Sequence, residues 1–560
     1  MSDRRISGVG VTPLRGVGTV VQYDSTVDLD ESERSAADPE TELQRFEAAR
    51  ETAADELARE QSQTAERVGT EEAEIFDAHQ QFLADPQITE GVETAISKDG
   101  VTAERAVSRA FEDPIATFEE ADGMFAERAD DLRDVRDRLL RILLDHDRVD
   151  LSALPEGTLL VAERLTPSDT AQLDPDAVAG FVTVEGGRTS HAAIMARSLA
   201  IPAVVGVDPD ALGLADGTRL VVDGTTGDVT VDPDADAVAA ARESSGATVE
   251  HDPVTTAGGR HVEVAANVGT PREAVAAAER GADGVGLFRT EFLFLDRETP
   301  PNEDEQYEAL SEVCETFAGS RVVVRTLDIG GDKPIPYVDS DPGDNPFLGV
   351  RGVRFAPGER PELFEEHVRA ILRAAAGPAQ LAVMFPLVST VTELDALLDE
   401  VSAIAAELDG EGVDYAVPEL GAMVETPASV FLAHEFADRL DFLSIGTNDL
   451  TQYVMAAARD DDRVASLHDP LHPPVLRAIA RTVEAAHEGD AWVGMCGEMA
   501  GDPALTELLV GLGLDELSMS AVTVPDVKAG VQGIDDESAA ALAEAALRAE
   551  TREDVRALID

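Results

Sequence analysis

The sequence contains very little lysine. Three of its 44 basic residues are lysines (Lys98, Lys333 and Lys528) and 111 residues are acidic, so the formal net charge is −67. Such a surface repels nucleic acid and anionic membranes. A disordered acidic chain is disfavoured, because 44% of the residues are apolar. We therefore expect a folded halophilic protein, in which concentrated cations screen the self-repulsion.

Cysteines and long apolar runs are also scarce. Cys314 and Cys496 are the only cysteines, too few for a disulfide framework, as expected in a reducing compartment. No apolar run approaches the ~20 residues of a membrane span, and residues 1–10 lack the apolar core of a signal peptide. We therefore expect a cytoplasmic protein, and a length of 560 residues indicates about two to four domains.

The first half changes from strand to helix and back. Residues 6–23 alternate glycine with β-branched residues and predict short strands with a turn at Pro13 and Gly16. Residues 39–145 have a helical period that fits about four helices, with His79 expected at the surface. Strand-like runs return at 159–161, 181–184, 203–205 and 220–222, which makes the helical segment an insertion into a small α/β domain. Residues 233–250 predict a linker helix.

The second half predicts a (β/α)8 barrel. Eight apolar runs alternate with helical stretches, and the longest spacing allows an insertion between the third and fourth strands. The predicted strands are 262–267, 284–289, 322–326, 381–385, 421–425, 442–446, 492–496 and 516–519. Active sites of such barrels lie at the carboxyl ends of the strands. The polar residues found there are Arg289, Glu291, Arg325, Asp328, Glu425, Asn448, Asp449, Cys496 and Glu498.

These residues suggest three chemical roles, each with an ordinary alternative. Converging arginines (Arg289, Arg325, Arg351 and Arg459) would bind phosphate or carboxylate, or each would be an ordinary surface or ion-paired arginine. Glu425 and Asp449 are oxygen ligands suited to Mg²⁺, or salt-bridge partners of the arginines. Cys496 could donate a proton, act as a nucleophile, or be a buried structural cysteine.

The stretch from Gly186 to Gly206 predicts a helix that begins beside a histidine. Ser190 is a natural helix cap, with Thr189 as an alternative, and Ile194, Met195 and Leu199 supply apolar positions. The helix start favours negative charge, so a phosphorylated His191 would be stabilised there, and a neutral imidazole can attack phosphorus. The alternative is an ordinary histidine at a helix start.

The residues 186–206 resemble the phosphohistidine signature of the phosphoenolpyruvate-utilising enzymes. Further motifs in the barrel half extend the resemblance to Enzyme I of the sugar phosphotransferase system: GVGLFRTEFLF (284–294), RTLDIGGDK (325–333), NPFLGVR (345–351), VETPA (424–428), SIGTNDLTQY (444–453) and GMCGEMAGD (494–502). The synthase and dikinase relatives carry a large nucleotide-binding domain, whereas about 185 mostly helical residues precede the signature here, with no Gly-rich phosphate loop.

The resemblance implies a multidomain α/β fold. Residues 1–37 and 148–232 would form an α/β phosphohistidine swivel domain. Residues 38–147 would be an inserted helical subdomain that docks the phosphocarrier protein HPr, residues 233–252 a linker helix at the hinge, and residues 253–560 a phosphoenolpyruvate-binding (β/α)8 barrel. The family also implies a homodimer.

The resemblance implies roles for single residues as well. His191 would accept the phosphoryl group, Thr170 would orient its imidazole, and Cys496 would protonate the enolate as pyruvate forms. Phosphoenolpyruvate would be held by Arg289, Arg325, Arg351, Asn448, Asp449, Arg459 and Lys333, and Mg²⁺ by Glu425 and Asp449. The alternatives are an enzyme like phosphoenolpyruvate synthase without the nucleotide domain, and a non-catalytic phosphohistidine regulator.

Overall fold

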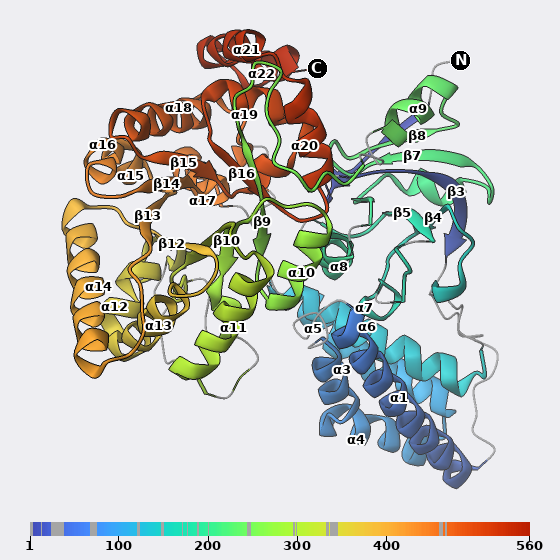
Figure 1. Cartoon of the computed structure of the whole chain (residues 1–560). Coiled ribbons are helices and arrows are strands. Elements are labelled where there is room, and N and C mark those ends of the chain that lie inside the picture. Colours follow the sequence, from blue (N-terminus) through green and yellow to red (C-terminus); the bar gives the residue numbers. More distant parts are fainter. Residues whose placement is uncertain are drawn as a thin grey trace. The chain divides into compact units, whose positions relative to one another are not determined.

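The chain divides into two compact units, Met1–Gly246 and Ala247–Asp560, which we describe separately (Figure 1). Among the residues that the structure describes, no helix combines the length and apolar character needed to cross a membrane. The computed structural model describes residues 4–12, 14–23, 38–67, 75–119, 124–146, 151–170, 172–175, 177–187, 190–199, 201–243, 248–294, 297, 299–331, 335, 345–458, 463–464 and 467–559.

The first unit contains an eight-stranded mixed sheet with the strand order β1-β8-β7-β3-β4-β5-β6-β2. Gly16 lies inside β3, so the turn predicted there is wrong. A Cβ at Gly16 would lie 1.8 Å from the Ala179 carbonyl oxygen, so close packing requires this glycine; Pro13 is outside the described residues. The strands are β1 (Arg4–Ser7), β2 (Val9–Gly10), β3 (Arg15–Tyr23), β4 (Thr158–Ala162), β5 (Val178–Thr183), β6 (Ala203–Val205), β7 (Arg219–Asp223) and β8 (Asp228–Val231).

A helical layer is inserted between β3 and β4, which are parallel neighbours in the sheet. Five α-helices are described instead of about four. The break between α3 (Ile75–Leu83) and α4 (Pro86–Thr94) falls at residues 84–85, where Asp85 caps α4 by accepting from the Gln87 amide at 2.7 Å. The helices are α1 (Pro39–Arg67), α3 (Ile75–Leu83), α4 (Pro86–Thr94), α5 (Ala103–Glu119) and α6 (Met124–Leu143), with a π-turn at Ala95–Asp99.

His79 lies inside this helical layer, so the surface position predicted for it is wrong. Its ring is fully buried, 6.0 Å from the ring of Phe76 one turn earlier. Its Nε2 lies 3.4 Å from Asp131 and its Nδ1 lies 3.3 Å from Asp134. Both carboxylates belong to α6, about 50 residues later in the chain. The residues next to His79 in the sequence therefore do not predict these contacts.

Polar contacts connect the helical layer and the sheet to the short helix α7 (Pro167–Thr170). Ser168 donates to Asp134 at 2.7 Å and accepts from Arg138 at 2.8 Å, so α6 holds α7 through two side chains. Tyr23, at the end of β3, donates to Asp169 at 2.7 Å. These contacts fix α7 beside α8 (His191–Ser198), with which it packs.

The predicted linker helix is shorter than expected. The helix α9 covers Ala235–Glu243, residues 248–250 are not helical, and residues 244–247 are outside the described part. Val238 and Ala241 pack against Val17 and Val221 of the sheet. The helix is therefore part of the first unit.

The second unit is a closed parallel barrel with the strand order β10-β11-β12-β13-β14-β15-β16-β9, which confirms the predicted (β/α)8 fold (Figure 1). Its strands are β9 (Glu263–Val268), β10 (Val285–Arg289), β11 (Arg321–Arg325), β12 (Gln380–Phe385), β13 (Glu419–Val424), β14 (Phe442–Ile445), β15 (Trp492–Met495) and β16 (Glu516–Met519). They fall within about two residues of the predicted runs.

Helices surround the barrel (Figure 1). The expected insertion between the third and fourth strands carries α12 and α13. The described helices are α10 (Pro271–Glu279), α11 (Glu303–Thr316), α12 (Ala356–Glu359), α13 (Pro361–Ala374), α14 (Val391–Glu411), α15 (Pro427–Phe431), α16 (Ala433–Ala437), α17 (Thr447–Met455), α18 (Pro473–Glu488), α19 (Thr506–Leu512), α20 (Val524–Gly533), α21 (Asp536–Arg548) and α22 (Arg552–Ile559).

A charged layer lies where the barrel strands begin. Alternate strands start with Glu263, Arg321, Glu419 and Trp492, the layered arrangement typical of such barrels. Arg321 pairs with Glu263 at 2.6 Å, and its guanidinium lies 4.0 Å above the Trp492 ring. Glu516 starts β16 and is 1% exposed. This end of the barrel therefore contains a carboxyl group with almost no access to water.

Candidate active site at the carboxyl ends of the barrel strands

The carboxyl ends of the strands gather the predicted polar residues, because all eight strands run in the same direction around a closed barrel. Arg289 ends β10 and Arg325 ends β11. Glu425 directly follows β13, and Cys496 directly follows β15. Thr447–Met455 forms the helix after β14 and carries Asn448 and Asp449.

Arg325 and Arg351 are buried at this end of the barrel. Arg325 pairs with Glu291 and lies 3.1 Å from Asp328. Arg351 donates to both oxygens of Asp328, at 2.9 and 3.0 Å, and to Asp449 at 3.1 Å. The carboxylates raise the pKa of both guanidinium groups, although burial opposes this. Two permanent positive charges are therefore fixed beside a patch of acidic oxygens.

Glu425 and Asp449 supply carboxylate oxygens whose hydrogen-bonding capacity is only partly used. Glu425 accepts from the Leu387 amide at 2.6 Å. Burial, together with the nearby charges of Asp449 and Asp328, raises the pKa of Glu425 to about 8. The Asp449 Oδ1 atom is buried without a hydrogen-bond partner among the described residues. Crowded carboxylates with an unpaired oxygen fit a divalent cation, whereas no cluster of three such ligands occurs in the described part of the chain.

Cys496 is buried at the end of the seventh strand. Its Sγ lies 3.5 Å from the Ser444 hydroxyl, and burial raises the pKa of the thiol to about 12. The thiol therefore keeps its proton at neutral pH. The backbone carbonyl of Cys496 accepts from the side-chain amide of Asn267 at 3.0 Å. The Ser518 hydroxyl donates to the Asn267 side-chain oxygen at 2.7 Å. Asn267 was missed by the sequence prediction, although it is polar and lies near the end of the first barrel strand.

The remaining predicted barrel residues are less enclosed. Arg289 is partly buried, and its guanidinium lies 4.5 Å above the ring of Phe292. Asn448 is partly buried, and its backbone carbonyl oxygen lies 3.1 Å from His468 Nε2. Glu498 is exposed. Two predicted ligands, Lys333 and Arg459, are outside the described residues.

The first unit positions the predicted phosphoryl acceptor at a helix start. Ser190 caps α8 by accepting from the Ala193 amide at 3.4 Å, as predicted. His191 is the first residue of that helix; its side chain is outside the described part. Thr170 is fully buried in α7 and donates to the Thr166 carbonyl at 2.6 Å. Ile194 is 39% exposed, so the apolar position predicted there is not buried.

Comparisons with known proteins cover nearly the whole chain. Models of the phosphoenolpyruvate-utilising enzymes match in three parts: the N-terminal domain at residues 7–128, the mobile domain at 154–227 and the phosphoenolpyruvate-binding domain at 243–536. A phosphoenolpyruvate-protein phosphotransferase of Haloferax volcanii is 60% identical, with 100% of this chain and 99% of the relative covered. The chain belongs to the phosphoenolpyruvate-protein phosphotransferase family.

Relatives with the same name occur in bacteria. The phosphoenolpyruvate-protein phosphotransferase of Staphylococcus carnosus is 42% identical, covering 95% of each chain. That of Bacillus subtilis is 40% identical, covering 99% of each chain. The family membership confirms the sequence resemblance.

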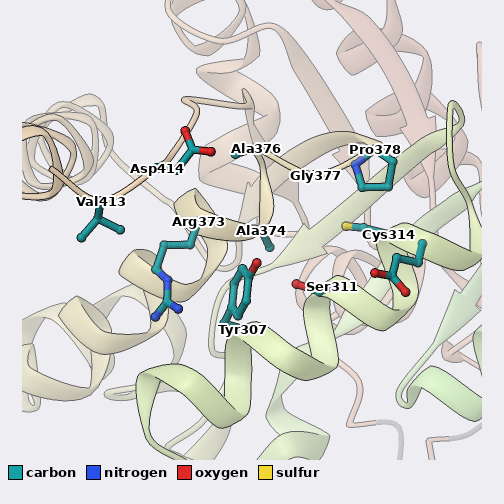
Figure 2. Close-up of a pocket in the computed structure, with 11 residues that line it drawn as sticks. Tyr307, Ser311, Cys314, Arg373, Ala374, Ala376, Gly377, Pro378, Val413 and Asp414 are labelled. Atoms are coloured by element: carbon teal, nitrogen blue, oxygen red, sulfur yellow. The ribbon is translucent and has the colours of Figure 1, made fainter.

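A cavity of about 350 Å³ lies elsewhere in this phosphotransferase, next to α11 and the segment after α13 (Figure 2). Tyr307 and Ser311 line one side, and Pro378, which comes just before β12, lines another. Arg373 stacks 4.3 Å above the Tyr307 ring and pairs with Glu303 at 2.6 Å. The cavity is therefore near the amino-terminal end of a barrel strand and shares none of the predicted site residues.

Proposed function

We propose that this chain transfers the phosphoryl group of phosphoenolpyruvate to His191 and from there to the phosphocarrier protein HPr, with release of pyruvate. This would be the first step of sugar uptake by the phosphotransferase system. The observation that supports the proposal most strongly is the buried group of two arginines and acidic oxygens at the carboxyl end of a barrel. Full-length similarity to phosphoenolpyruvate-protein phosphotransferases supports the same activity.

The arginines would bind the anionic substrate. Arg289, Arg325, Arg351 and Arg459 would hold the phosphate and carboxylate groups, with Asn448 and Lys333 assisting. In the described structure Arg325 and Arg351 are held by carboxylates, so the groups are already oriented when substrate arrives. Phosphoryl transfer depends mainly on such positioning and on neutralising charge.

Glu425 and Asp449 would hold Mg²⁺. When bound, Mg²⁺ would offset the negative charge of the phosphoryl oxygens. Burial raises the pKa of Glu425, and repulsion from Asp449 and Asp328 raises it further. Binding of the cation would relieve that repulsion.

Cys496 would supply the proton that completes pyruvate. When the phosphorus–oxygen bond breaks, the phosphoryl group goes to the His191 imidazole and the three-carbon product leaves as an enolate. The Cys496 thiol, protonated at neutral pH because burial raises its pKa to about 12, would donate its proton to the enolate carbon. Solvent would then return a proton to the thiolate.

The two units would carry different parts of the reaction. His191 belongs to the first unit and the arginines to the second. In the proposed cycle α8 would be at the barrel for charging and away from it for transfer to HPr, with the region 233–250 as the hinge. Thr170 would orient the imidazole, and the helical layer would dock HPr. We further propose a cytoplasmic homodimer that works at high salt, where cations screen the charge of −67.

The test is incubation of the full chain with phosphoenolpyruvate labelled on phosphorus, Mg²⁺ and about molar KCl. The expected result is acid-labile, base-stable label on the wild type, none on His191→Ala, and an equal amount of pyruvate. HPr should then remove the label. Label from ATP alone would instead favour a synthase-like enzyme, and label that HPr never removes would favour a regulator.

A further inference from the structure

A line of buried polar side chains leads from two barrel helices to the end of β10. It consists of Gln306 in α11, His367 in α13 and Thr290, all at most 1% exposed. His367 Nδ1 lies 2.7 Å from Gln306 Oε1, and His367 Nε2 lies 3.3 Å from the Thr290 hydroxyl. Thr290 donates to the Arg325 carbonyl at 2.7 Å. None of these three side chains has a role in the chemistry described above.

The contacts determine where the protons lie. The Gln306 amide nitrogen donates to the Pro301 carbonyl at 2.9 Å, so the amide oxygen faces the imidazole. An amide oxygen only accepts, so His367 carries its hydrogen on Nδ1. Burial lowers the pKa of His367 to about 3, which keeps the ring neutral. His367 Nε2 therefore presents a lone pair to Thr290.

The Thr290 hydroxyl consequently has one proton and two acceptors. The Arg325 carbonyl is the nearer acceptor and His367 Nε2 the more distant one. Donation to Arg325 ties the end of β10 to the end of β11. Donation to His367, after rotation of the hydroxyl, would release that tie.

Thr290 stands between two residues of the candidate site. Arg289 precedes it, and Glu291, which follows it, pairs with the Arg325 side chain. Arg289 and Arg325 are also opposite each other in the parallel ladder of β10 and β11. The contacts to the Arg325 carbonyl and to its guanidinium therefore add to the backbone pairing. Loss of the hydroxyl would remove one of these two contacts, so the spacing of the Arg289 and Arg325 side chains would be less well defined.

We propose that Thr290, by donating to the Arg325 carbonyl, is a positioning residue that keeps Arg289 and Arg325 at the spacing needed to bind the phosphoenolpyruvate anion, and that the His367 lone pair, oriented by Gln306, competes for the same proton. This inference rests on the proposed function. The three residues act through the arginines and do not touch the substrate.

The first test compares Thr290→Val and Thr290→Ser in a steady-state assay of pyruvate release, using the full chain with HPr in excess. Val keeps the shape and removes the hydroxyl, and we expect it to raise KM for phosphoenolpyruvate about tenfold while kcat changes by less than about threefold. Ser keeps the hydroxyl and should restore KM to within about twofold of wild type. Thr482→Val is the matched control, because Thr482 is equally buried and donates at 3.0 Å within α18.

The second test asks whether the residues act as one unit. His367→Phe removes both ring nitrogens, and combined with Thr290→Val it should raise KM little more than the worse single variant. Independent effects that multiply would contradict a shared mechanism. An unchanged KM in Thr290→Val, or an equal defect in Thr290→Ser, would overturn the proposal.

The third test does not depend on turnover or on a variant that folds. Nitrogen-15 NMR of histidine-labelled wild type should show His367 as the neutral Nδ1–H tautomer. A proton on Nε2, or a charged ring near pH 7, would overturn the arrangement. If the wild type releases no pyruvate from phosphoenolpyruvate, the proposed function fails while this spectrum still decides the proton placement.

Discussion

Replacing Glu516 with Gln should make the barrel more stable at neutral and alkaline pH. Glu516 is 1% exposed, and neither of its carboxyl oxygens has a hydrogen-bond partner among the described residues. Burial, reinforced by the charge of Glu263, raises the pKa of Glu516 from 4.5 to about 8. The folded chain therefore holds a proton that the unfolded chain releases between these two values.

The direction and size of the effect follow from this difference. Below pH 4.5 both states are protonated and Glu516 adds no pH dependence. As pH rises from 4.5 to 8, the free energy of unfolding falls by up to about 1.4 kcal/mol per pH unit. The total is on the order of 5 kcal/mol. The amide of the Glu516→Gln variant cannot ionise, so this loss should be absent from it.

The barrel provides its own reporter for the measurement. Trp492 is the only tryptophan, and it stacks on Phe442 with the ring centroids 4.4 Å apart. Urea unfolding followed by its fluorescence, in molar KCl from pH 5 to 9, gives the free energy of each variant. Glu362→Gln is the control, since that carboxylate belongs to a side chain that is 61% exposed. Parallel pH profiles for wild type and Glu516→Gln would refute the reasoning.

Three further substitutions test other parts of the barrel. Gly286→Ala should lower the free energy of unfolding by about 1–3 kcal/mol, measured by urea unfolding, because its Cβ would lie 2.5 Å from Ser518 Cβ; wild-type stability would contradict this. Cys496→Ala should slow pyruvate release about 10²- to 10⁴-fold, and a wild-type rate would exclude the thiol as the proton donor. Asp328→Asn should destabilise the barrel by about 3 kcal/mol, because it removes the carboxylate that accepts from Arg351 through both oxygens; an unchanged urea midpoint would contradict this.

The barrel was predictable because its signal is local. Each strand is a short apolar run, and several runs end at or next to a polar residue. The positions of Arg325, Glu425 and Cys496 at strand ends were therefore predictable from the sequence. Helix caps were predictable for the same reason. Ser190 directly precedes α8, and its side chain accepts from a backbone amide in the first turn of that helix.

Other contacts depend on tertiary structure and left no local signal. Arg351 reaches Asp328 because an insertion folds back, with Gly330 bridged to Arg351, and sequence spacing does not encode that return. Thr290 and His367 lie on different elements and meet only in the folded barrel.

The insertion of the helical layer affects how the first unit folds during its synthesis. Arg4 of β1 pairs with Val231 of β8, so the edge of the sheet cannot close until most of that unit has left the ribosome. At ~10 residues per second, the first strand waits on the order of 20 s. The helices of the insertion make mainly local contacts and can form within that time. During synthesis the helical layer would therefore act as a scaffold on which the rest of the sheet assembles.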